Sequence, residues 1–390
     1  MPSTEQFRFK KNYLMTPGPT PIPESVVSVF AQPIIHHRTP EFQKLFEDVK
    51  QGLKEVFQTK QDVMMLTSTG TGAMDAAVSN LFQKGETVIT VNGGKFGDRW
   101  TKISKAYGLN PIEIFVERGQ AVTLDQIQEA YSNHQDVKAI LFQAHETSTG
   151  VAMPIQEICG FAKKNDLYTI VDGITGVGVF DIPMDQWGID VLLSGSQKAF
   201  MIPPGLAFIA LSERAWSKVE SNNIEHFYFD LKKERKGLST NQTAWTPAIS
   251  LIQGLQTSLA MIQQEGLQNT FARHQLLSQC ARNAADALGL ERLAKEHPSP
   301  ALTSIKVPDG VDGKAIPKLM RDHYGVTIAG GQDELAGKIF RISHFGYAGI
   351  FDVTTAFSCL ELVLDQLGHP VEFGRGVGAA LKTFQEGDRK

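Results

Sequence analysis

The residue whose setting most clearly indicates chemistry is Lys198. It follows the apolar run DVLLS and lies in the segment SGSQKAFMIPPG, whose prolines and glycines do not readily continue a strand. A lysine held in an apolar pocket loses its proton more easily than an exposed one, and it can then form an imine with a carbonyl compound. Because a lone lysine at a strand end is more often simply solvated, the prediction needs support from other residues.

Asp172 is the first supporting residue, because it ends another apolar run, YTIVD. Ligands of an α/β sheet bind outside the carboxyl ends of its strands, so Asp172 and Lys198 are expected to face one crevice. A lysine that forms an imine, with an acid facing a pyridine nitrogen, is how proteins hold pyridoxal 5′-phosphate (PLP). In the alternative interpretation, Asp172 only caps the turn that follows it.

A PLP site also needs a phosphate cradle, for which the segment TSTGTGAMD is a candidate. Thr69, Gly70 and Thr71 stand directly before a predicted helix, whose N-terminal amides and dipole favour an anion. An ordinary strand-to-helix turn uses the same residue types. Thr147 in HETSTG is a candidate donor to a cofactor oxygen. Phe96 in NGGKFGDRW is a candidate ring to lie against a planar cofactor, although an aromatic side chain there is more often part of the core.

These candidates follow apolar runs that alternate with helical patterns between residues 63 and 211, and this alternation predicts an α/β fold with a mainly parallel sheet. The predicted strands are 63–67, 87–91, 112–116, 137–142, 168–172, 190–194 and 207–211. Helices with apolar positions three or four apart are predicted at 73–82, 99–108, 124–131 and 155–165.

The remainder of the chain predicts a second, smaller α+β domain. Residues 213–246 are more polar and irregular, and their LKKERKG run is interpreted as a solvated surface loop without a functional role. Predicted elements then follow as helices at 247–264 and 267–288, strands at 302–307, 326–331 and 339–343, and a helix at 353–367. We therefore divide the chain into an N-terminal arm (1–20), a large domain (21–265) and a small domain (266–390).

The composition excludes several classes of protein. Of 390 residues, 42% are hydrophobic and 21% are charged, as in ordinary globular proteins, and the net charge of −4 argues against a nucleic-acid partner. The cysteines Cys159, Cys280 and Cys359 are far apart, so neither a disulfide framework nor a metal site is expected. Because no signal-peptide pattern or run of 18 apolar residues occurs, we expect a cytoplasmic protein without a membrane segment.

Eight segments taken together resemble the class V aminotransferases, in particular the alanine or serine:glyoxylate aminotransferase group. They are TPGPTPIP, STGTGAMDAA, NGGKFGDRW, HETSTG, VDGITGVG, SGSQKAF, TAWTPAIS and KIFRISHFG, and the likeness runs from about Tyr13 to Leu367. The resemblance implies the type I fold of PLP enzymes, with a large domain, a small C-terminal domain and a homodimer whose sites lie at its interface.

The resemblance also implies roles around the ring of PLP. Lys198 is similar to the lysine that forms the Schiff base, and Asp172 to the acid that keeps the pyridine nitrogen protonated. Phe96 occupies the place of the stacking aromatic residue, which is often Trp in the family. Thr147 is similar to the donor near the phenolic oxygen, where Ser is common.

Further roles are implied for the phosphate of PLP. Gly70, Thr71 and Gln197 match positions of the phosphate cradle, and Thr71 replaces the His of some relatives. Thr243 and Thr246 in QTAWTPAIS are similar to residues that reach the phosphate bound by the neighbouring subunit. Dimerisation would then be a requirement for catalysis.

For the substrate, Arg341 in KIFRISHFG resembles the arginine that binds the α-carboxylate, a task that suits its planar guanidinium. The backbone around Gly18 matches the N-terminal segment that lines the substrate pocket. His37 and Arg38 match a pair that contacts a distal anionic group in phosphoserine aminotransferases, but the favoured interpretation is that they only cap a helix or hold the dimer.

The implied reaction is a ping-pong transamination through a Lys198 aldimine, with alanine or serine as donor and glyoxylate or pyruvate as acceptor. Arg38 and Arg99 leave an acidic donor such as aspartate open, and a PLP lyase, for example a kynureninase-like one, is a further alternative. A desulfurase is disfavoured because residues 325–341 contain no Cys, and a nicotinamide dehydrogenase because the GxGxxG turn is missing. The non-enzymatic alternative is a subunit recruited to another complex.

Overall fold

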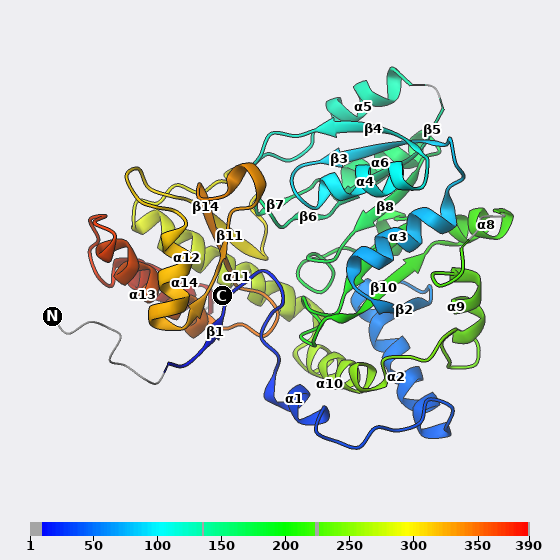
Figure 1. Ribbon diagram of the computed structural model, residues 1–390, viewed down its shortest axis with the longest axis horizontal. Coiled ribbons are helices and arrows are strands. Elements are labelled where there is room, and N and C mark those ends of the chain that lie inside the picture. The colour runs from blue at the N-terminus through cyan, green and yellow to red at the C-terminus, as the bar shows by residue number, and fades with distance from the viewer. Residues whose placement is uncertain (1–9, 135, 223–225, 389–390) are drawn as a thin grey trace.

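The computed structural model describes residues 10–134, 136–222 and 226–388. A large domain surrounds a mixed, mainly parallel sheet, and a small α+β domain built mostly from the C-terminal part of the chain lies beside it (Figure 1). This arrangement is the fold predicted from the sequence, and the long helix α11 (Leu267–Ala287) passes from one part to the other (Figure 1).

The large domain is organised by a seven-stranded sheet. Its strands are β2 (Val63–Ser68), β3 (Thr87–Asn92), β4 (Asn110–Phe115), β5 (Val137–Gln143), β8 (Tyr168–Asp172), β9 (Val191–Gly195) and β10 (Gly205–Leu211). Their order is β2-β10-β9-β8-β5-β3-β4, in which β10 runs antiparallel to both neighbours and the other pairs are parallel. All seven predicted strands are confirmed. The near-continuous apolar runs that predicted them reflect burial on both faces of the sheet.

Helices pack on this sheet and on one another around it, and five of the predicted helices, 73–82, 99–108, 124–131, 155–165 and 247–264, are among them. The helices are α1 (Glu24–Val29), α2 (Pro40–Phe57), α3 (Gly70–Leu81), α4 (Gly97–Ala106), α5 (Leu124–Ser132), α6 (Ile155–Lys164), α7 (Met184–Trp187), α8 (Glu213–Ser221), α9 (Leu231–Leu238) and α10 (Ile249–Glu265). Local sequence fixes some of their ends. The Thr123 side chain accepts the Gln126 N–H while the Gln126 side chain accepts the Thr123 N–H, and this capping box begins α5.

The interpretation of LKKERKG as a surface loop is wrong, because these residues form helix α9. The Asp230 side chain accepts the Lys233 N–H at 3.1 Å and so caps the N-terminus. Leu231, Glu234 and Leu238 lie on one buried face at helical spacing, while the basic side chains between them cover the other face. The high charge of the run concealed this amphipathic pattern.

The small domain contains the predicted strands, with one of them divided. Its elements are α11, β11 (Leu302–Lys306), α12 (Ala315–Tyr324), β12 (Val326–Thr327), β13 (Ala329–Gly330), the 3-10 turn η2 (Asp333–Leu335), β14 (Ile339–Ser343), α13 (Ile350–Gln366) and α14 (Arg375–Asp388). The predicted strand 326–331 is split, since β12 pairs with β1 (Tyr13–Leu14) and β13 pairs with β14. Helices α12 and α14 were not predicted.

The apolar side chains form two principal cores, one around the seven-stranded sheet and one between α11, α13 and β14. The N-terminal segment joins the second core through Met15. The proposed domain limits of 21–265 and 266–390 stay a prediction. Within the described part of the chain, no helix is long and apolar enough to cross a membrane.

Candidate functional site

A cavity of about 200 Å³ lies at the carboxyl ends of β2, β5, β8 and β9. It brings together all the predicted site residues except Thr243, Thr246 and Arg341. The residues that line it are Gly18, Thr69, Gly70, Thr71, Phe96, Arg99, His145, Thr147, Asp172, Ile174, Thr175, Gln197 and Lys198.

Lys198 is 9% exposed and follows β9 at the cavity. Burial lowers the pKa of its amine to about 8, against the opposing effect of the nearby Asp172 carboxylate. The amine donates a hydrogen bond to the Pro17 carbonyl, and a Cβ at Gly18 would overlap the Lys198 side chain. The N-terminal segment therefore forms the wall of the cavity against this lysine.

Asp172 is buried at the end of β8, and its Oδ1 accepts the Ile174 N–H at 2.8 Å. Burial raises the pKa of this carboxyl to about 6, although the Ile174 N–H and the positive charges of Arg99 and Lys198 favour its ionised form. A further positive charge in the cavity would favour the carboxylate more strongly. This is the property expected of an acid that faces a protonated pyridine nitrogen.

The predicted phosphate cradle lies at the N-terminus of α3. Thr69 occupies the position before the helix without bonding to its amides, so the N-terminal N–H groups of α3 are not capped by that side chain. Arg99 donates from Nη1 to Thr71 Oγ1 at 2.7 Å, which places a guanidinium at this cradle. Gln197 also lines the cavity, and its buried Oε1 has no partner among the described residues.

Phe96 and Thr147 reach the cavity from two loops. The Arg99 guanidinium lies 5.1 Å from the centre of the Phe96 ring, and Thr147 Oγ1 donates to Thr175 Oγ1 at 3.0 Å. His145, which was not predicted, also lines the cavity. Burial lowers the pKa of its imidazole to about 3, with the positive charge of Lys198 adding to the effect. Its position two residues before Thr147, in the same segment HETSTG after an apolar run, was the available signal.

These residues fit PLP. The cavity combines a buried lysine, a buried carboxyl group and a helix N-terminus with an adjacent guanidinium, which match an aldehyde, a pyridine nitrogen and a phosphate. Gln197 Oε1 and His145 Nε2 are buried polar atoms without a partner in the described chain, so polar ligand atoms have partners available there.

Arg341 lies in β14 next to the cavity and does not line it. Its Nη1 donates to the Thr147 carbonyl at 2.7 Å, and its Nη2 donates to the Gly330 carbonyl at 2.7 Å. Burial lowers the pKa of the guanidinium to about 10. Arg341 is thus held between a loop of the large domain and a strand of the small domain.

Thr243 and Thr246 lie at a different cavity, of about 650 Å³, together with His37, Arg38 and Lys233. Within one chain the structure does not bring them to Lys198. This location leaves the predicted contact with a partner's phosphate as a prediction. It also places the His37–Arg38 pair beside the two threonines.

The fold and the site define the class of the protein, and comparison with known families agrees. The model of the family described as Aminotransferase class-V matches residues 12–348, which is most of the chain. The protein therefore belongs to the class V aminotransferases, a family of PLP-dependent enzymes. The resemblance found in the sequence is confirmed.

Individual relatives are similar over almost their whole length. The chain is 38% identical to the soluble hydrogenase 42 kDa subunit of Anabaena cylindrica, with 96% of this chain and 99% of that protein aligned. It is 33% identical to L-aspartate–glyoxylate aminotransferase of Paracoccus denitrificans (96% and 97%) and 34% identical to serine–glyoxylate aminotransferase of Hyphomicrobium methylovorum (97% and 96%). The crystal structure of ureidoglycine–glyoxylate aminotransferase from Bacillus subtilis superposes with a TM-score of 0.92 at 26% identity, covering 97% of this chain and 100% of that one.

Proposed function

We propose that the protein transfers the amino group of a small amino acid, alanine or serine first, to a 2-oxo acid such as glyoxylate or pyruvate in a ping-pong reaction. The observation that carries the proposal is the single cavity that holds Lys198, Asp172 and the N-terminus of α3. Two relatives support glyoxylate as the acceptor, since both are named for it.

PLP, when bound, supplies the electron sink that makes the α-proton of an amino acid acidic. In this proposal Lys198 holds the cofactor and then moves the proton, because an amine with a pKa near 8 is both a competent base and a competent acid near neutral pH. Asp172 holds the proton on the pyridine nitrogen. Phe96 and Thr147 orient the ring, while Thr69, Gly70, Thr71 and Gln197 hold the phosphate.

Arg341 binds the α-carboxylate of the substrate in this proposal. Its two carbonyl partners fix the plane of the guanidinium, so a carboxylate meets donors that already have one orientation. The Gly18 backbone forms the opposite side of the substrate space, against Lys198.

We further propose a homodimer in which Thr243 and Thr246 reach the phosphate bound by the partner. Two observations support this: both threonines lie away from the cavity of their own chain, and they line a separate cavity with basic residues. Two exposed aromatic side chains, Phe227 and Tyr228, stack on the half-buried Trp245 in the same region.

Aspartate is the second candidate donor. One relative is named for aspartate, and Arg99 places a positive charge at the cavity. The non-enzymatic alternative is that this protein is a subunit of a larger assembly, and the name of the Anabaena relative, a hydrogenase subunit, supports it.

The test follows the visible absorption of the purified protein with PLP while alanine, serine, aspartate and cysteine are added in turn without an acceptor. The proposal expects one small donor to remove the visible band and glyoxylate to restore it. Lys198→Ala is expected to abolish the band and to reduce turnover by roughly 10²–10⁴-fold, whereas Lys163→Ala, at an exposed position, leaves both unchanged. If the wild-type protein takes up no PLP, the assembly-subunit alternative replaces the proposal.

A further inference from the structure

Glu146 is a completely buried acid next to the cavity that the proposed chemistry does not use. Five donors surround its carboxylate. Oε1 accepts from Ser148 Oγ at 2.5 Å, from Ser148 N at 3.1 Å and from Phe96 N at 3.4 Å. Oε2 accepts from Gly97 N at 2.9 Å and from Gln143 Nε2 at 3.0 Å. A buried charge is tolerated when such donors compensate for its lost hydration.

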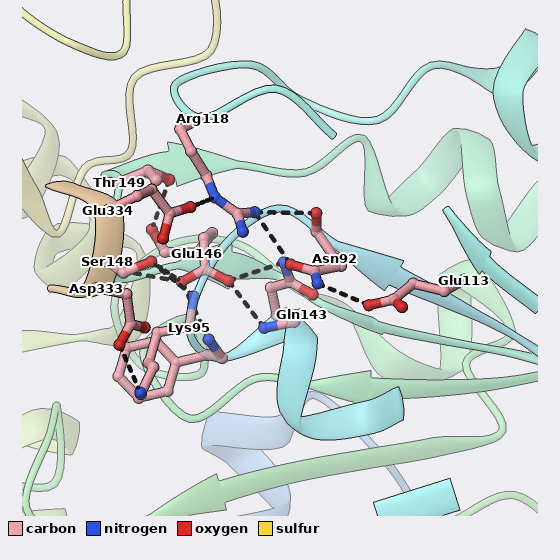
Figure 2. Close-up of polar contacts among 12 residues, drawn as sticks. Asn92, Lys95, Glu113, Arg118, Gln143, Glu146, Ser148, Thr149, Asp333 and Glu334 are labelled. Atoms are coloured by element: carbon pink, nitrogen blue, oxygen red, sulfur yellow. Dashed lines mark hydrogen bonds and ion pairs between the residues drawn. The ribbon is translucent and has the colours of Figure 1, made fainter. Parts of the chain in front are cut away.

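Four of the five donors come from the two loops that present cofactor-facing side chains, and the fifth, Gln143, ends strand β5 (Figure 2). The amides of Phe96 and Gly97 lie at the start of α4, and Ser148 directly follows Thr147. Ser148 Oγ also accepts the Lys95 N–H at 3.0 Å, so this hydroxyl joins both loops to the carboxylate. One side chain therefore fixes the backbone on either side of the cavity.

The sequence of the first loop is adapted to this close contact. A Cβ at Gly94 would overlap Ser148 Oγ and the Glu146 carboxylate, and a Cβ at Gly97 would overlap the Val91 carbonyl. Gly94 thus allows the loop to lie directly on Glu146, and Gly97 allows the start of α4 to lie against the end of β3.

The Glu146 carboxylate also influences the position of Arg341, the residue proposed to bind the substrate. Arg341 Nη1 donates to the Thr147 carbonyl, which lies between Glu146 and Ser148 in the chain. The other carbonyl that holds Arg341 belongs to Gly330, just before the turn η2. Fixing Thr147 therefore fixes one of the two anchors of the guanidinium.

Two ion pairs extend this contact network to η2 (Figure 2). Lys95 Nζ lies 3.0 Å from Asp333 Oδ1, and Arg118 pairs with Glu334. Arg118 also donates to the Asn92 carbonyl at 3.2 Å. The segment between β13 and β14 is thereby tied to the loop that carries Phe96.

We infer that Glu146 is a positioning residue, whose carboxylate sets Phe96 and Thr147 around the PLP ring and, through the Thr147 carbonyl, the guanidinium of Arg341. The inference rests on the proposed function, because that proposal assigns Phe96 and Thr147 to the PLP ring and Arg341 to the substrate. Glu146 itself touches neither, since it does not line the cavity.

The decisive experiment compares Glu146→Gln with the wild-type protein, both saturated with PLP. The amide keeps the shape of the side chain but turns an NH₂ group toward backbone N–H donors, so at least one of the two loops must move. The expected results are a PLP dissociation constant raised by about tenfold, a changed circular dichroism of the bound cofactor, and a higher KM for the amino acid.

The matched control is Glu113→Gln. Glu113 is exposed and accepts from Asn92 Nδ2 at 2.7 Å within the same network, but it contacts neither cavity loop. This variant is expected to behave as the wild type. Ser148→Ala removes the hydroxyl that donates to Glu146 and accepts the Lys95 N–H. It is expected to change the PLP dissociation constant, the circular dichroism of the bound cofactor and the KM in the same direction as Glu146→Gln. This second variant allows the test to be made if Glu146→Gln does not fold.

The outcomes distinguish a failure of the role inferred for Glu146 from a failure of the proposed function. If the wild type binds PLP and transaminates while Glu146→Gln and Ser148→Ala lose only thermal stability, with unchanged dichroism and PLP affinity, Glu146 is merely structural and the inference is overturned. If the wild type itself shows no PLP band, the proposed function fails instead.

Discussion

At the scale of single residues, Lys198 carries the most direct consequence. Its pKa of about 8 lies below that of an exposed lysine because burial disfavours the ammonium form. Only the neutral amine attacks an aldehyde, so the PLP-free protein is expected to react with PLP about tenfold faster per pH unit up to pH 8 and at a constant rate above it. Stopped-flow absorption between pH 6 and 10 measures this, and a rate that keeps rising to pH 10 would contradict it.

Gly18 gives a second prediction, because its φ of 128° disfavours a side chain and a Cβ there would displace the amine end of Lys198. Gly18→Ala is expected to lose PLP affinity by tenfold or more, in addition to about 1–3 kcal/mol of stability from backbone strain. Gly85→Ala is the control, since Gly85 has a φ of 90° with open space around it and shares only the strain. Equal PLP affinity in both variants would show that Gly18 does not shape the cavity.

The residue level also marks what the sequence could predict. Lys198, Asp172 and Thr147 were predicted because each follows an apolar run, and strand ends meet at one edge of the sheet. Arg99 was noted only as a possible contact for an acidic substrate, and the structure places it at Thr71. Glu146 was missed because its role depends on amides about 50 residues away, a contact that no local pattern encodes.

At the scale of elements, helix α11 ties the two domains together through His274. This buried imidazole donates from Nδ1 to the Val179 carbonyl at 3.0 Å and accepts the Gly346 N–H on Nε2 at 3.1 Å. Both bonds need the neutral ring. Burial lowers the pKa of His274 to about 4, with the charge of Arg273 adding to the effect.

The sign of the resulting pH dependence follows from proton linkage. Below pH 6.5 the unfolded chain binds a proton at this position that the folded chain does not, so stability falls as the pH drops from 6.5 toward 4, by up to about 1.4 kcal/mol per pH unit. His274→Gln is expected to be less stable at pH 7 and to lose less stability between pH 7 and 5. The free energy of unfolding, measured in urea at pH 7 and at pH 5 for both proteins, tests this prediction. His134→Gln, at an exposed position, should follow the wild type.

The accuracy of the element predictions varies for physical reasons. Strands such as β5 were predicted because burial on both faces leaves an unbroken apolar run. Helix α9 was missed because five of its eight residues are charged and stand in a row, and only Leu231 and Leu238 signal the buried face. The split between β12 and β13 was also missed, since it depends on two different partner strands, one of which, β1, lies more than three hundred residues earlier in the chain.

At the scale of the whole molecule, the proposed dimer predicts complementation between two inactive variants. Lys198→Ala removes the lysine of its own chain, and Thr246→Glu places a negative charge where the partner's phosphate is expected. A mixed dimer would then contain one intact site. Co-refolding equal amounts should restore about a quarter of the wild-type activity if the chains pair at random. Each variant refolded alone is the control, and a mixture no more active than these would contradict the shared site.

The wall of the cavity formed by Pro17 and Gly18 has one further consequence. The segment is anchored next to Lys198 by the pairing of Tyr13 with Val326, residues that lie more than three hundred positions apart in the sequence. During synthesis, a domain that leaves the ribosome first can fold first. Here β1 can pair only after β12, more than three hundred residues later in the sequence, has left the ribosome. The cavity is therefore completed only after β12 has been synthesised, and loading of PLP is expected to follow that step.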